Sequence, residues 1–199
     1  MLSETYYRHD ELLRESVNIE TGMKGVISNM DIEGIIKHLE SEISNPSEGL
    51  PEEIFLFATG ITPMINVDLL IKNESRQTLL TWREDCFFGP GWHIPGGIIR
   101  YKESIEKRLH AVAATELGVK IAFDDVPLAI NEVIQQSRRS RGHFISLLYN
   151  CKLLGVPDDA LMHKGGEPRA GEWRWHSDCP DNIISVHEMY RKFMSSGGK

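Results

Sequence analysis

The chain has 199 residues, of which 41% are hydrophobic, which is enough for one buried core with an appendage or for two very small domains. Its net charge of -7 argues against general nucleic-acid binding but allows a small anionic substrate held by local arginines. Cysteines at 86, 151 and 179 show no zinc or disulfide spacing, and no apolar segment reaches the ~20 residues of a membrane helix. We therefore expect a cytoplasmic protein without membrane or nucleic-acid partners.

Residues 1–60 are predicted to form a helical extension. Residues 1–30 are polar, and Asp31 is suited to cap a helix with an apolar face of Ile35, Ile36, Leu39 and Ile43. A second helix is expected to begin near Pro51 and to bury Ile54, Leu56 and Phe57. Packing or a dimer contact explains this extension better than a catalytic role.

Residues 61–199 are predicted to form one domain. Alternation over residues 65–71 predicts a strand, and residues 78–83 are expected to return as its hairpin partner. Further strands are expected at 128–135, 143–153 and 172–176. A helix over 104–117 has a core stripe of Ile105, Leu109, Val112, Ala113 and Leu117. A last helix over 183–194 would bury Ile184, Val186, Met189, Tyr190 and Phe193. Mixed strands and helices in this order indicate an α/β sandwich.

The most informative segment begins at Gly91 and ends at Val119. The adjacent Gly96 and Gly97 are followed by Glu103, and Glu116 lies on the helix after this loop. A loop whose carbonyls can approach a cation, next to a helix that directs a carboxylate to the same point, can hold Mg²⁺ against a diphosphate. The segment therefore predicts a metal-assisted site.

This spacing resembles the Nudix box, G-x5-E-x7-R-E-U-x-E-E-x-G-U, where U is a bulky aliphatic residue. Five fixed positions match, namely Gly97, Glu103, Glu116, Gly118 and Val119. Three polar positions of the box are replaced by Ala111, Val112 and Thr115. The entry to the box is also typical of the family, with Trp92, Pro95, Gly96 and Gly97.

The flanking segments, over about residues 62–193, are similar to the GDP-mannose mannosyl hydrolase branch of the family, which also lacks two box carboxylates. The resemblance implies a Nudix-like α/β/α sandwich with a mixed sheet. It implies a hydrolase that uses Mg²⁺ or Mn²⁺ and splits a GDP-mannose-like nucleotide-sugar into nucleoside diphosphate and sugar. A homodimer with residues 31–72 in its interface is also expected. Two alternatives stay open: a pyrophosphohydrolase that attacks phosphorus, and a non-catalytic module that binds a nucleotide-sugar.

The resemblance also implies roles for single residues. Glu116 would be a metal ligand and the carbonyl of Gly96 another, while Glu103 would support the loop by hydrogen bonds. Arg83 falls where the branch has a diphosphate arginine, and Arg100 could replace the branch's second one. Asp68 matches a substrate-binding aspartate, although an aspartate in this pattern can equally face solvent.

The general base is the least defined part of the sequence. The branch's metal ligand and base fall on Arg169 and Ala170, which can serve neither role. Glu167 is the best substitute, with His163 and Glu172 as neighbouring candidates, while His143 and His187 are more often structural histidines. The arginines at 138, 139 and 141 can bind phosphate, although a charged hairpin loop is more often solvated.

Overall fold

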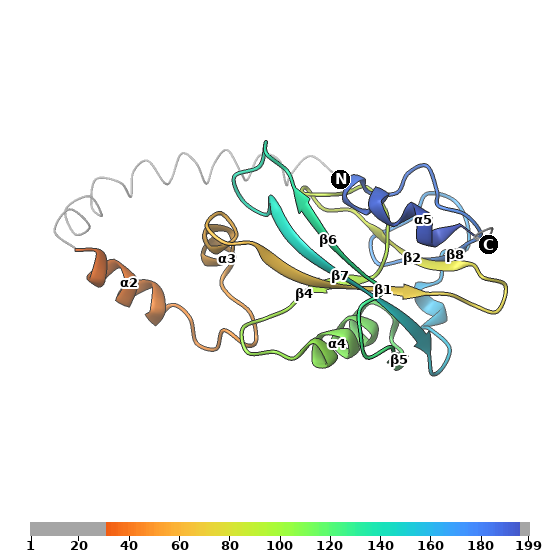
Figure 1. Cartoon of the computed structure of the whole chain (residues 1–199), viewed down its shortest axis with the longest axis horizontal. Helices are drawn as coiled ribbons and strands as arrows, with labels where there is room; N and C mark the ends of the chain where they lie inside the picture. The colour runs from red at the N-terminus through yellow and green to blue at the C-terminus, as the bar shows by residue number, and fades with distance from the viewer. Residues whose placement is uncertain (1–30, 196–199) are drawn as a thin grey trace. The chain divides into compact units, whose positions relative to one another are not determined.

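The computed structural model describes residues 31–195 (Figure 1). They fall into two units, one that ends at Ser44 and one that begins at Asn45. In the first unit, helix α2 (Ile32–Ser41) begins where expected, because the Asp31 side chain accepts a hydrogen bond of 2.8 Å from Gly34 N. Residues 1–30 of the predicted extension lie outside the described residues. Within the described part of the chain α2 buries no residue, and self-association through residues 31–72 stays a prediction.

The second unit includes helix α3 (Glu52–Ala58) as well as the strands, and the domain boundary at residue 61 stays a prediction. The expected burial of Phe57 is wrong, because this side chain is 59% exposed. Residues two positions apart on a helix point in different directions, so a helix this short cannot bury both Phe55 and Phe57 against one surface. Phe55 is the one that lines the larger groove described below.

Within residues 31–195, eight strands form two sheets. The larger sheet contains β1 (Met64–Ile71), β4 (Gly96–Ile98), β5 (Ile121–Phe123), β6 (Ala129–Ile134) and β7 (His143–Leu153). The smaller sheet contains β2 (Thr78–Arg83), β3 (Gly91–His93) and β8 (Trp173–His176). β1 and β7 run parallel and the other pairs antiparallel, so the predicted α/β fold with a mixed sheet is confirmed.

The predicted hairpin between the first two long strands is wrong. β1 pairs with β4 on one edge and with β7 on the other, so neither edge is free for β2. β2 joins the smaller sheet, and a single bridge between Lys72 and Thr78 connects the two strands at the turn. The sequence does not predict β3, β4 and β5, because three residues are too few to show a period.

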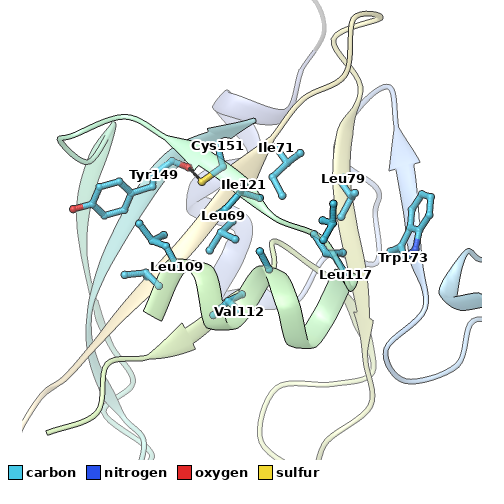
Figure 2. Packing of buried hydrophobic residues seen from close by; sticks show 13 residues of the cluster. Leu69, Ile71, Leu79, Leu109, Val112, Leu117, Ile121, Tyr149, Cys151 and Trp173 are labelled. Carbon is cyan, nitrogen blue, oxygen red and sulfur yellow. Dashed lines mark hydrogen bonds between the residues drawn. The ribbon is translucent and has the colours of Figure 1, made fainter. Parts of the chain in front are cut away.

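Helix α4 (Ile105–Leu117) covers one face of the larger sheet. It begins after the Ser104 cap and ends at Gly118, whose φ of +64° favours glycine. Its apolar side packs on β1, as Figure 2 shows, and the buried contacts come from Leu109, Val112, Ala113, Leu117, Val67, Leu69 and Ile71. The expected burial of Ile105 is wrong: this first helical residue is 37% exposed, and the buried cluster takes helix residues only from Leu109 onward.

The C-terminal segment covers the opposite face (Figure 1). The predicted single helix is a 3₁₀ helix, η2 (Ser185–Tyr190), followed by a short α5 (Arg191–Met194). The helix cannot begin at residue 183, because Ile183 forms a bridge with Trp92 and Ile184 N donates to Trp92 O. Ile184 and Tyr190 are buried as expected, whereas Val186, Met189 and Phe193 are half-buried. Within residues 31–195, no helix has the combined length and apolarity that crossing a bilayer requires.

Candidate active site

Asp68 lines a small cavity of about 70 Å³, on the face of β1 that points away from α4. One of its oxygens, Oδ2, accepts hydrogen bonds from Asn66 Nδ2 at 3.0 Å, from Tyr190 OH at 2.6 Å and from Ser146 Oγ. Its other oxygen, Oδ1, lies so close to Gly96 that a β-carbon there would clash with it. Glycine at 96 therefore lets β4 pair beside a carboxylate that has one oxygen fixed and the other uncommitted.

Asp68 is only 2% exposed, and burial raises the pKa of its carboxyl to about 6. The three hydrogen bonds and the positive charge of Arg83 oppose this rise. The pKa of this carboxyl is therefore closer to neutral pH than that of a solvated aspartate, which favours a role in proton transfer.

Two buried histidines, His93 on β3 and His187 on η2, line the same small cavity as Asp68. The Nδ1 of His187 accepts from Ile94 N at 3.0 Å, so its proton is on Nε2, 3.9 Å from Asp68 Oδ1. The Nδ1 of His93 donates to Thr81 O at 2.8 Å, so its Nε2 keeps a lone pair. Burial lowers the pKa of both rings, to about 3 for His187, and both are neutral near pH 7.

Glu116, near the end of α4, contacts Gly96, Thr81 and His93. Its Oε1 accepts from Gly96 N at 3.2 Å, its Oε2 accepts from Thr81 Oγ1 at 2.9 Å, and Oε2 lies 3.6 Å from His93 Nε2. The side chain is 23% exposed, and burial, with a contribution from Asp68, raises its pKa to about 7. A partly desolvated carboxylate beside an imidazole lone pair is a donor set that suits a divalent cation.

Among residues 31–195, no group of three His, Cys, Asp or Glu side chains is arranged to hold a metal. Glu116 offers one carboxylate, and Mg²⁺ can be held by one or two carboxylates together with water and substrate phosphates. Gly96 meets Glu116 through its N–H, and its carbonyl remains a predicted ligand.

The other box positions serve the fold. Val112 is buried against Gly97, and Thr115 is exposed. Glu103 accepts from Arg100 N at 3.0 Å and pairs with Arg108 at 2.6 Å, and these contacts outweigh burial and lower its pKa. Glu103 lines neither cavity, so this geometry ties the box loop to α4.

Arg83, at the end of β2, lines both the small cavity and a larger groove of about 730 Å³. It pairs with Asp85 at 2.7 Å, and its charge acts on the carboxyl groups of Asp68 and Glu116. Within the described chain the groove has no acidic lining residue, whereas its basic ones are Arg83, Arg100, Lys102, Arg108 and Arg141. A groove of this charge in a protein of net charge -7 favours an anionic ligand.

The predicted base, Glu167, is exposed and lines neither of these cavities. The neighbouring candidates His163 and Glu172 pair with each other, with His163 Nδ1 2.8 Å from Glu172 Oε2. Arg169 also pairs with Glu172, through Oε1 at 2.7 Å. These contacts hold the loop before β8. The structure therefore does not bring Glu167, His163 or Glu172 to Asp68.

Glu172 should support the acid stability of the fold. Its hydrogen bonds with His163 and Arg169 lower its pKa to about 2. A carboxyl whose folded pKa lies below its unfolded value of 4.5 stabilises the fold above pH 4.5 and loses that contribution as the pH falls toward 2. We expect Glu172→Gln to lower the free energy of unfolding at pH 7 but much less at pH 3. Urea unfolding at the two pH values measures this, with the exposed Glu167→Gln as control. An equal loss at both would contradict it.

Four residues of this site are not predicted as site residues from the sequence: Ser146, Tyr190, His93 and His187, the last of which is expected to be structural. One feature of the sequence does indicate a polar site on β1: Asn66 and Asp68 alternate on a strand whose other face is apolar. Tyr190 carried no signal, since its pattern is that of a core residue and its hydroxyl meets Asp68 across 122 positions of sequence.

Comparisons with known proteins identify the fold. No family model matches the chain. A MutT NUDIX hydrolase from Burkholderia pseudomallei is similar at TM-score 0.52 and 19% identity, over 67% of this chain and 99% of that one. A NUDIX hydrolase from Nitrosomonas europaea is similar at TM-score 0.51 and 17% identity, over 67% and 70%. At these identities the likeness concerns the fold alone, and the chain has the fold of the Nudix hydrolases.

A curated relative matches only part of this chain. The low-salt glycan biosynthesis protein Agl8 of Haloferax volcanii is 29% identical over 84 residues, which is 42% of this chain. The match spans 53% of that protein, so this chain corresponds to about half of its length.

Proposed function

We propose that this protein is a divalent-metal-dependent hydrolase that splits a GDP-mannose-like nucleotide-sugar into nucleoside diphosphate and sugar. The observation that carries the proposal is the position of Arg83. It lines both the small cavity, which holds Asp68 and His187, and the larger groove. A diphosphate bound at Arg83 has its sugar carbon toward Asp68 and its nucleoside in the groove.

The larger groove suits a nucleoside attached to phosphate. Its wall includes Phe55 and Tyr101, and Tyr101 is 60% exposed and offers an aromatic face to a base. Arg100 and Lys102 lie beside it on the box loop and add positive charge. The absence of acidic lining residues within the described chain means that a phosphate chain meets no repulsion there.

A Mg²⁺ or Mn²⁺ ion fits at Glu116, within reach of His93 Nε2, with the diphosphate and water as its other ligands. The ion would supply positive charge to the departing diphosphate. Arg83 does the same from the protein, through a guanidinium that can bind two phosphate oxygens at once.

Attack at the sugar carbon is favoured over attack at phosphorus. With Val112 and Thr115 in place of carboxylates, the box helix directs Glu116 alone to the site, and several metal ions there would be poorly neutralised. Departure of a diphosphate from carbon requires positive charge near the leaving group, to neutralise its negative charge. It does not require a metal-bound hydroxide beside phosphorus. Asp68 would be the general base in place of Glu167, because three donors orient its carboxylate and leave Oδ1 to accept a proton from water.

Hydrolysis of GDP-mannose with Mg²⁺ in ¹⁸O-water tests the proposal. Label in free mannose, with GDP as the other product, is the expected result, and a chelator should abolish the reaction. Label in GMP or mannose 1-phosphate would show attack at phosphorus and would make the protein a pyrophosphohydrolase. Mass spectrometry of the separated products gives the answer in one experiment.

A second candidate is a module that binds a nucleotide-sugar without turnover. The observation in its favour is that the described residues hold no cluster of three metal-binding side chains. Tight binding of GDP-mannose in calorimetry, with no product after prolonged incubation with Mg²⁺ or Mn²⁺, would establish it.

A further inference from the structure

Arg141, in the loop between β6 and β7, is packed among aromatic rings. Its guanidinium carbon lies 4.4 Å from the ring centre of Phe87, 5.4 Å from Phe88 and 5.8 Å from Phe55. Its backbone N–H donates to Thr59 Oγ1 at 3.1 Å. Its φ of +53° is rare for residues other than glycine, so these contacts must hold it. The side chain is therefore oriented by the fold rather than solvated.

Positive charge is concentrated around Arg141. The guanidinium carbons of Arg83 and Arg138 lie 5.9 Å and 4.5 Å from the same Phe88 ring. The carboxylate of Asp85 pairs with Arg83. Burial raises the pKa of Asp85, but backbone hydrogen bonds and the charges of Arg83 and Arg141 outweigh this effect and lower it. Burial, together with the charges of Arg83 and Arg138, lowers the pKa of Arg141. Like charges held this close are relieved by a bound anion.

Within the described chain, Arg141 also has an unpaired hydrogen-bond donor, and its side chain lines both cavities. Its Nε is buried and has no hydrogen-bond partner among residues 31–195. Like Arg83, it lines both the small cavity and the larger groove. The two arginines therefore lie where the two cavities adjoin, one at the end of β2 and one in the loop between β6 and β7.

We propose that Arg141 is a second diphosphate-binding residue, which with Arg83 grips the two phosphoryl groups of a nucleoside diphosphate where the cavities meet. The direction of the substrate rests on the proposed function, with the sugar toward Asp68, but the binding of diphosphate does not. Each planar guanidinium can take two oxygens of one phosphoryl group, so the pair selects a diphosphate over a monophosphate.

Titration calorimetry of GDP and GMP, with Mg²⁺ present, tests this pair. Arg141→Gln should weaken GDP binding by about tenfold to a hundredfold, the effect of one charge-assisted contact, and should weaken GMP binding by less. Arg141→Lys should fall between, since lysine keeps the charge but not the fork. Arg139→Gln is the matched control on the same loop: it is exposed and lines neither the small cavity nor the larger groove, and it should bind GDP as the wild type does.

Two outcomes would overturn the inference: GDP affinity unchanged in Arg141→Gln, or equal losses for GDP and GMP in both Arg141 variants. Thermal unfolding of each variant separates a lost contact from a lost fold, and the lysine variant keeps the test valid if glutamine destabilises the loop. Because binding is measured without turnover, Arg141-dependent GDP binding by a protein that hydrolyses nothing would refute the proposed function and leave this inference standing. Hydrolysis of GDP-mannose by the wild type, with unchanged GDP affinity in Arg141→Gln, would support the proposed function and refute this inference.

Discussion

Under the proposed function, Glu116→Gln should lower kcat/KM for GDP-mannose by about a thousandfold or more. The proposed divalent ion would lose its one carboxylate from the box helix, and such an ion stabilises the charge of a departing diphosphate by several kcal/mol. The fold should survive. A glutamine oxygen can accept from Gly96 N, and its amide can donate to Thr81 Oγ1, so both contacts of Glu116 have a replacement. Since burial disfavours the ionised form of Glu116, the neutral amide should not lower the melting temperature at pH 8.

The control for Glu116 is on the same helix. Glu106→Gln removes an exposed carboxylate from the first turn of α4 and should leave both activity and metal affinity unchanged. Mn²⁺ binding to each variant can be followed directly by electron paramagnetic resonance, apart from any turnover. Wild-type Mn²⁺ affinity in Glu116→Gln would show that the ion is held elsewhere.

Asp68→Asn should lower kcat by about a hundredfold to ten-thousandfold with a smaller change in KM, which is the usual loss when a general base is removed. The asparagine oxygen can take the place of Oδ2 and accept from Asn66, Ser146 and Tyr190. Its amide then replaces Oδ1 and offers a donor where the reaction needs an acceptor. The substitution thus changes the chemistry of one atom and keeps the network around it.

Asp124→Asn is the comparison for this variant, since Asp124 is an exposed aspartate that accepts from Asn150 at 3.1 Å on another part of the sheet. It should hydrolyse GDP-mannose at the wild-type rate. Single-turnover kinetics would separate the chemical step from product release. If Asp68→Asn raised KM strongly and left the single-turnover rate intact, Asp68 would be a substrate-binding residue and the base would lie elsewhere.

The fold was largely predictable because its long elements carry clear periods. The box helix and the strands that became β1, β2 and β7 were placed within one or two residues, since each buries one or both faces. The pairing of β1 and β2 was not predictable from the turn between them. β4 and β7, which come from later parts of the sequence, pair with the two edges of β1 and leave no edge for β2.

The site was only partly predictable, for a related reason. Glu116, Gly96 and Arg83 lie in or beside a recognisable motif, and the structure brings them close to Asp68. His187, Tyr190 and Arg141 follow no motif, because their positions depend on tertiary contacts with β1, β3 and the aromatic residues after β2. The expectation for Glu167 relied on counting along a loop, and the ion pair of Arg169 with Glu172 sets that loop's course instead.

The dependence of Asp68 on Tyr190 has a consequence for biosynthesis. The two residues are separated by 122 positions, and the segment that carries Tyr190 also covers Trp92 and Leu80. A nascent chain on the ribosome can pair β1 with β4 long before this segment emerges. Until it does, Asp68 lacks a donor and an apolar sheet face is open to other chains. Chains that stop before Tyr190 should therefore be both inactive and prone to aggregate, which makes completion of the segment around Tyr190 a condition for correct folding.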